Sequence, residues 1–237
     1  MLENHHCATA FKFLMQNDTS FFDKMERRDF ILFRKYVITG ILNTDMAEHF
    51  SMVNSISFKV DKEKEFTPDE EKSPEHFLDF FSLIIHTNDL FTPAKKPNIS
   101  MVWANRINRE FMDQLNHEKK IDLPPTPFLV GLDNLEIRAK SEGFFYDKIV
   151  EPLWGLMDRV LEGGLHEQMK QVKDNREVWR KVQSGKFTIN DLRKIENPAG
   201  EQDERKNGMP KIVNKRNRKL MMMNKNGTRS VILTGKR

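Results

Sequence analysis

Ile85-His86-Thr87-Asn88-Asp89-Leu90 is one of four short stretches that together decide how this chain is interpreted. Two stretches precede it, Leu2-Glu3-Asn4-His5-His6 and Leu42-Asn43-Thr44-Asp45-Met46-Ala47-Glu48-His49, and one follows it, Gly143-Phe144-Phe145-Tyr146-Asp147-Lys148-Ile149-Val150-Glu151-Pro152-Leu153-Trp154. Each is short, and part of each is apolar enough to be ordinary core. The four stretches are informative because all of them occur, in this order, in one chain.

Between these stretches the apolar residues recur at three- and four-residue steps, which is the period of amphipathic helices. We expect helices over residues 23–40, 45–58, 100–119, 144–161 and 165–182, and a central apolar helix that begins at Pro74. Thr44 is expected to cap the second helix, and Ser73 the helix that begins at Pro74. The strand-like alternation of residues 230–234 is weak, so the pattern predicts an all-α, multi-helix bundle.

Composition favours one folded domain with a tail. The chain has 237 residues, of which 38% are hydrophobic, and this is enough to bury a substantial core. Residues 196–237 contain eleven Lys or Arg and four Asp or Glu, a net charge of +7, which leaves −3 for residues 1–195 in a chain of formal net charge +4. We expect residues 1–195 to fold and residues 196–237 to form a disordered basic tail.

The tail and the single cysteine bear on location and partners. Basic residues 215–219 are compatible with an acidic partner such as nucleic acid, a nuclear importer or an anionic membrane, but a simply solvated tail is the better-supported reading. Cys7 cannot form an intramolecular disulfide, which favours a reducing compartment. The sequence has no apolar run long enough to cross a membrane and no signal peptide, so we expect a soluble, cytoplasmic protein.

The four stretches resemble the catalytic domain of class I 3′,5′-cyclic-nucleotide phosphodiesterases, an all-α bundle of the HD-domain superfamily. The resemblance extends from about Met1 to Val182 and includes Asp174-Asn175-Arg176-Glu177. The family's first metal-ligand segments would lie upstream of Leu2. We therefore expect an N-terminally truncated catalytic domain over residues 1–195.

The resemblance implies a site with zinc and with magnesium or manganese, where two metal ions activate a water molecule. Asp89 matches the family's downstream metal-ligand aspartate, and Glu3, Thr44 and Asp45 match residues that support the metal pocket. The other candidate ligands do not show chelating spacing; they are His5, His6, His49 and His86. His5 and His6 project about 100° apart on a helix, which suggests one buried and one exposed side chain. We expect that this chain alone does not hold the metals.

The resemblance also implies a pocket for the purine base. Phe145 matches an aromatic clamp, and the matching apolar walls are Met46, Leu90, Ile107 and Phe111. The alternative is that all five residues are ordinary core. Two positions depart from the family pattern: Glu142 replaces a glutamine, and Thr92 replaces an asparagine.

The Glu142 substitution changes the hydrogen-bonding chemistry of the pocket. An ionised carboxylate only accepts hydrogen bonds, whereas an amide both donates and accepts. Guanine presents two adjacent donors that suit a carboxylate, while adenine presents one donor and one acceptor. Taken alone, Glu142 therefore predicts a preference for guanine.

The function expected from this resemblance is hydrolysis of cyclic AMP or cyclic GMP to the 5′-monophosphate, with this chain an incomplete and inactive piece of the enzyme. Its expected partners are the cyclic nucleotide and either the missing N-terminal portion or further copies of itself. The alternative is a catalytically dead helical module that binds a nucleotide or another protein. A third class, a basic-tailed adaptor that uses the helical body as a scaffold, has less support.

Overall fold

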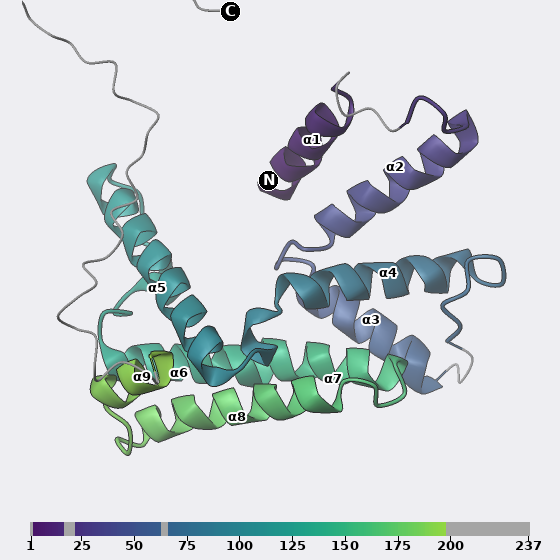
Figure 1. The fold of residues 1–237 in the computed structure, drawn as a ribbon. Helices are drawn as coiled ribbons and strands as arrows, with labels where there is room; N and C mark the ends of the chain where they lie inside the picture. Colours follow the sequence, from purple (N-terminus) through teal and green to yellow (C-terminus); the bar gives the residue numbers. More distant parts are fainter. Residues whose placement is uncertain (1, 17–21, 63–65, 198–237) are drawn as a thin grey trace, which may run out of the picture. The chain divides into compact units, whose positions relative to one another are not determined.

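The computed structural model describes residues 2–16, 22–62 and 66–197, and in this part of the chain the regular elements are all helices, without strands (Figure 1). The elements are α1 (Leu2–Leu14), α2 (Arg27–Leu42), α3 (His49–Lys62), α4 (Pro74–Asp89), η1 (Thr92–Ala94), α5 (Pro97–Lys120), η2 (Pro127–Leu129), α6 (Leu135–Phe145), η3 (Tyr146–Val150), α7 (Glu151–Val160), α8 (His166–Gln183) and α9 (Ile189–Glu196). The predicted all-α class is confirmed.

α4 begins as the sequence predicts. Ser73 accepts a hydrogen bond from the backbone N–H of His76 at 3.4 Å, and Pro74 occupies the first turn. Its missing N–H is not needed there, because the first N–H groups of a helix have no partner within the helix. Leu83 is fully buried, and α4 contacts α2, α3 and α7, so its predicted central position is also confirmed.

The helix expected at residues 45–58 begins four residues later, and the predicted Thr44 cap is wrong. Thr44 Oγ1 donates instead to the carbonyl of Ile41 at 2.8 Å, while Asp45 Oδ1 accepts from the N–H of Ala47 at 2.9 Å. Both side chains therefore stabilise the turn between α2 and α3. Such local side-chain bonds compete with helix formation, and α3 starts only at His49.

The helix expected at residues 144–161 is longer than predicted and contains a change of pitch. It begins at Leu135, where Asn134 accepts from the N–H groups of Glu136 and Ile137 at 2.9 and 3.2 Å. η3 is a π-helical turn in which Glu151 N–H donates to the carbonyl of Tyr146, five residues earlier. Pro152 follows directly, and since proline cannot donate to the α-helical ladder, the wider turn lets α6 continue into α7.

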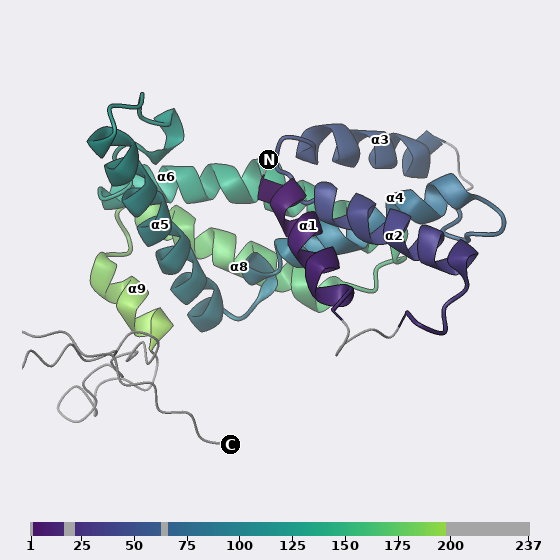
Figure 2. The same cartoon turned by 90° about the horizontal axis from the view of Figure 1, so that it is seen from above.

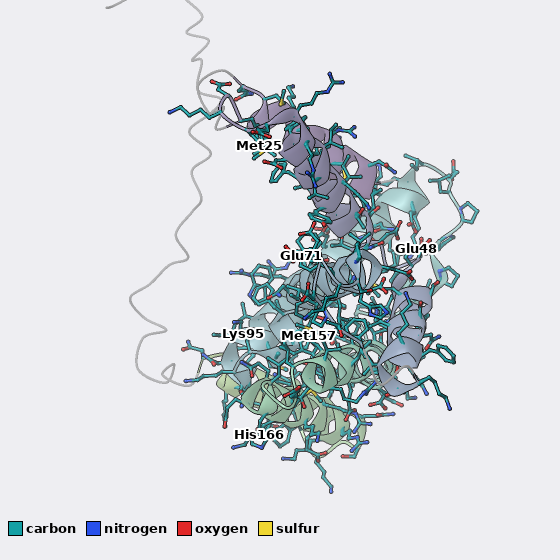
Figure 3. The ribbon with its side chains drawn as sticks, turned by 90° about the vertical axis from the view of Figure 1, so that its right-hand side faces the viewer. Met25, Glu48, Glu71, Lys95, Met157 and His166 are labelled. Atoms are coloured by element: carbon teal, nitrogen blue, oxygen red, sulfur yellow. The ribbon has the colours of Figure 1, made fainter. Side chains whose placement is uncertain are left out.

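Three clusters of buried side chains hold the helices together. α6 and α7 run in one line along α8 (Figure 1), and this layer surrounds the fully buried Trp179. α3 and α4 pack on α7 through a second cluster around Leu83 and Leu153, and Figure 2 shows α2 and α3 beside α4. The third cluster closes the end of α5 against η2. Figure 3 shows Met157 inside the helical body, with Glu48 and His166 at its edge.

α9 was not predicted, although its capping box is visible in the sequence. Thr188 and Asp191 bond reciprocally through side chain and backbone, which is a common signal for a helix start. The tail predicted at residues 196–237 starts later than expected, because Glu196 is the last residue of α9; its residues from 198 onward, including the weak strand at 230–234, lie outside the described residues. Within the described ranges, no helix combines the length and the hydropathy that a membrane crossing requires.

Candidate functional site

The C-terminal part of α4 is the point where the four sequence stretches meet. His86 lies on α4 and His49 begins α3, and His49 Nδ1 is 2.9 Å from His86 Nε2. Asn43, in the turn after α2, donates through Nδ2 to Ser82 Oγ at 2.8 Å. Two stretches that are separated by more than thirty residues are thus joined by side-chain hydrogen bonds.

The His49–His86 pair is fully buried. Burial lowers the pKa of both imidazoles, that of His49 to about 4, because desolvation penalises the charged form and a charged His86 would repel it. His49 Nε2 and His86 Nδ1 have no hydrogen-bond partner among the described residues, although the backbone of Asn43 lies close enough to raise the pKa of His86. Both rings are therefore neutral at pH 7 and pin α3 to α4.

Asp89, the last residue of α4, is exposed and lies near the first turn of α1. Its pKa is raised because the surrounding chain displaces water from the carboxyl group; His6 lowers this pKa, and Glu3 raises it further. The stretch at residues 2–6 therefore approaches the predicted metal ligand, as the resemblance implies.

The prediction of one buried and one exposed histidine in α1 is wrong, since His5 and His6 are both exposed. The buried position of this helix is Cys7, which faces α2 and donates weakly from Sγ to the carbonyl of Ile38 at 3.9 Å. α1 packs mainly against α2, and both imidazoles remain exposed to solvent.

The described residues do not form a complete metal site. Among them, no three His, Cys, Asp or Glu side chains lie together in a way that could hold an ion, whereas a catalytic zinc usually has three protein ligands. Asp89, His6 and Glu3 lie near one another without forming such a set. The metal chemistry implied by the resemblance therefore does not fit the described part of the chain alone.

Two side chains that the sequence interpretation did not single out fix the loop after Asp89. Trp154, from the fourth stretch, donates through Nε1 to the carbonyl of Leu90 at 3.1 Å. Asn175 of α8 is buried and donates through Nδ2 to the carbonyls of Pro93 and Lys95, both at 2.7 Å. Together they hold η1 and the start of α5 against α7 and α8.

A small cavity lies between α5 and α6. Its volume is about 30 Å³, and its lining comprises Ile107, Asn108, Phe111, Leu132, Arg138, Ser141 and Glu142. Three of the residues predicted to bind the base, namely Ile107, Phe111 and Glu142, therefore meet at one place. Burial raises the pKa of Glu142 to about 7, even though Arg138 lowers it, so this carboxyl group is poised between neutral and ionised forms near neutral pH.

The other predicted pocket residues lie outside this lining. Met46 is exposed in the turn between α2 and α3, Leu90 packs against the core of α3, α4 and α7, and Thr92 starts η1. Phe145 packs on the Trp179 core and makes an edge contact with Tyr146. Arg138, which does line the cavity, was not predicted.

With this geometry established, comparison with known proteins identifies the family. The family model of the 3′,5′-cyclic nucleotide phosphodiesterases matches residues 1–172. The chain belongs to this family. Phosphodiesterases of this family generally use divalent metal ions.

Individual phosphodiesterases show the same relationship at moderate identity. The chain is 28% identical over 200 residues to the mouse high affinity cAMP-specific and IBMX-insensitive 3′,5′-cyclic phosphodiesterase 8A, an alignment that covers 79% of this chain and 24% of that protein. It is 32% identical over 162 residues to the Drosophila melanogaster dual specificity calcium/calmodulin-dependent 3′,5′-cyclic nucleotide phosphodiesterase 1, covering 68% of this chain and 18% of that protein.

A solved structure shares the fold. The phosphodiesterase domain of the RhoPDE fusion protein from the choanoflagellate Salpingoeca rosetta superposes with a TM-score of 0.72 at 27% identity, covering 78% of this chain and 57% of that domain. The chain thus spans about a quarter or less of the two relatives above and just over half of a solved phosphodiesterase domain.

Proposed function

We propose that this chain forms the nucleotide-binding part of a 3′,5′-cyclic-nucleotide phosphodiesterase, a hydrolase that converts cyclic AMP or cyclic GMP to the 5′-monophosphate. The observation that carries the proposal is the convergence of the four stretches on the end of α4. His49 bonds to His86, Trp154 bonds to Leu90, and His6 lies near Asp89. Core packing alone does not account for an exposed carboxylate, that of Asp89, at the end of α4 where these stretches meet.

The base end of the site is assigned to the cavity between α5 and α6. Ile107 and Phe111 provide apolar surface for a purine ring, and Glu142 provides a polar group for its edge. Phe145 lies one turn beyond Glu142 in α6, and we assign it the role of the aromatic clamp. Met46, Leu90 and Thr92 are proposed to complete the walls when the nucleotide binds.

The phosphate end is assigned to Asp89. We propose this carboxylate as one ligand of the zinc and magnesium or manganese ions that such enzymes use, with Glu3, Thr44 and Asp45 as supporting residues. The remaining ligands come from outside the described residues, either from a further part of the polypeptide or from a partner chain.

A nucleotide-binding module without hydrolysis is the second candidate. The observation that favours it is that the described residues line a small cavity with three of the predicted base-binding residues but contain no group of three side chains that could hold a metal ion. Both candidates require that the chain bind cyclic nucleotides, and they differ in whether turnover follows when a complete ligand set is supplied.

Equilibrium dialysis of the 237-residue chain against labelled cyclic AMP and cyclic GMP tests the proposal. We expect saturable binding that is competed by the unlabelled cyclic nucleotide and not by ribose 5-phosphate, which has no base. Ile107→Ser should weaken it. Ile99→Ser is the matched control, because Ile99 is on the same helix and both side chains are 41% exposed. Absence of saturable binding, or equal loss in both variants, would contradict the assignment.

A further inference from the structure

Arg138 occupies an unusual position for a charged residue. Its side chain is only 7% exposed, and its Nε and Nη2 atoms are buried without a hydrogen-bond partner among the described residues. The guanidinium carbon lies 5.1 Å from the centre of the Trp179 ring, which supplies a favourable cation–π contact. Buried charged groups in proteins are nearly always paired or hydrogen-bonded, so the free donors of Arg138 require an explanation.

Neighbouring carboxylates do not satisfy these donors. Glu142 lies one helical turn away on α6, and Glu196 lies on α9. Burial lowers the pKa of Arg138, and the charges of both carboxylates raise it. Within the described ranges, neither forms a hydrogen bond or ion pair with it, and Glu196 instead accepts from Asn105 Nδ2. Arg138 therefore keeps buried donor capacity available for a ligand.

Arg138 lines the same cavity as Glu142. Arg138 only donates hydrogen bonds, and an ionised Glu142 only accepts them, so one wall presents a donor and an acceptor side by side. A volume of about 30 Å³ leaves room for about two water-sized groups. This is enough for the polar edge of a ring but not for the whole ring.

We propose that Arg138 and Glu142 form a donor–acceptor pair that reads the edge of the nucleobase, with Arg138 as a specificity-determining residue. This inference rests on the proposed function. On adenine, Arg138 donates to a ring nitrogen while Glu142 accepts from the amino group. On guanine, Arg138 donates to the carbonyl oxygen while Glu142 accepts from the ring N–H. Arg138 thus offsets the guanine preference that Glu142 alone predicts, and the pair accommodates both bases.

Removing the Arg138 side chain should weaken binding of cyclic AMP more than binding of cyclic GMP. Without this donor, the ring acceptor of adenine faces a carboxylate and has no partner, whereas guanine can rotate to offer both its ring N–H and its amino group to Glu142. Cyclic IMP has the carbonyl and ring N–H of guanine but lacks the amino group, so it should behave like cyclic AMP. An unsatisfied buried group corresponds to a loss of about five- to 150-fold in affinity.

The test is to measure dissociation constants of the full chain for cyclic AMP, cyclic GMP and cyclic IMP. Arg138→Met removes the donors and keeps apolar contact with Trp179. We expect weaker binding of cyclic AMP and cyclic IMP, by about five- to 150-fold, with cyclic GMP affected least. Arg106→Met is the matched control, because Arg106 also lies 5.1 Å from a tryptophan ring, that of Trp103, but is exposed. This variant should leave all three constants unchanged.

The outcomes distinguish this inference from the function on which it rests. If the wild type binds the nucleotides and Arg138→Met weakens all three equally, or none, Arg138 does not read the base and only this inference fails. If the wild type binds none of them, the proposed function fails, and the inference with it. Should Arg138→Met not fold, Arg138→Leu decides: it also lacks hydrogen-bond donors and should disfavour cyclic AMP relative to cyclic GMP. An unchanged ratio in a folded Arg138→Leu protein would overturn the inference.

Discussion

Replacing Glu142 by glutamine should stabilise the protein above pH 7 and have little effect at pH 4.5. The pKa of Glu142 rises from 4.5 to about 7 on folding, mainly through desolvation. Since its folded-state pKa is the higher one, the favourable contribution of this group is complete below pH 4.5 and is lost as the pH rises through 7. Glutamine has similar shape and does not titrate, so it does not lose this contribution.

The size of this stabilisation follows from the pKa shift of Glu142. Each pKa unit corresponds to about 1.4 kcal/mol, and discounting for the partly exposed side chain leaves about 2 to 3 kcal/mol. For a domain of this size, that is a rise in Tm of about 4 to 12 °C at pH 8. Urea unfolding of wild type and Glu142→Gln at several pH values between 4.5 and 8 measures the difference directly.

The quantity to follow is the difference in free energy of unfolding between wild type and Glu142→Gln at each pH, because other groups also titrate in both proteins. The buried His49 and His86 have lowered pKa values, so they make both proteins less stable as the pH falls below about 6.5. Glu136→Gln is the control on the same helix: Glu136 is exposed, and Lys140 lowers its pKa, so any pH-dependent difference has the opposite sign. A free-energy difference between wild type and Glu142→Gln that is constant from pH 4.5 to 8 would refute the reasoning.

Further predictions concern activity, association, the loop after α4 and the histidine pair. With zinc, magnesium or manganese added, the purified chain should hydrolyse neither cyclic AMP nor cyclic GMP above a heat-treated control, because the described residues lack a complete ligand set; metal-dependent turnover that Asp89→Ala abolishes would contradict this. The exposed apolar side chains of α1 to α3 should cause self-association detectable by light scattering, and a monodisperse monomer that binds no hydrophobic dye would count against it. Asn175→Ala should lower the free energy of unfolding by about 1 to 3 kcal/mol through loss of its hydrogen bonds to the carbonyls of Pro93 and Lys95, measured by urea unfolding; an unchanged midpoint would contradict this stabilising role. His49→Gln should be less sensitive to acid than wild type between pH 6.5 and 4, and parallel stability curves for the two proteins would argue against a buried neutral His49.

The parts of the fold that depend on local signals could be predicted from the sequence. Ser73-Pro74 fixes the start of α4, and the helical period identifies α5 and α8 to within a few residues. The start of α6 was missed because residues 135–143 have no strong apolar stripe, although Asn134 supplies a recognisable cap. Thr188 gave a similar signal for α9. The competing bonds of Thr44 within its own turn shifted the start of α3.

The site was harder to predict because its contacts join distant segments. Neither the His49–His86 pair nor the bonds from Asn175 to the η1 loop follow from any periodicity, since each joins residues from two different elements. The spacing of Arg138 and Glu142, four residues apart, places them on one helix face and could have been noticed. The burial of Arg138 against Trp179 could not be predicted from the sequence, because it depends on how α6 packs on α8.

Photolabelling with an azido-substituted cyclic AMP, followed by mass spectrometry of the digested chain, tests the central claim most directly. If the four stretches assemble a cyclic-nucleotide site, the label should attach to peptides of α5 or α6 that contain Phe111 or Glu142, and excess unlabelled cyclic AMP should prevent it. Labelling confined to residues 198–237, or labelling that cyclic AMP does not compete, would contradict the assignment of the nucleotide site to this cavity.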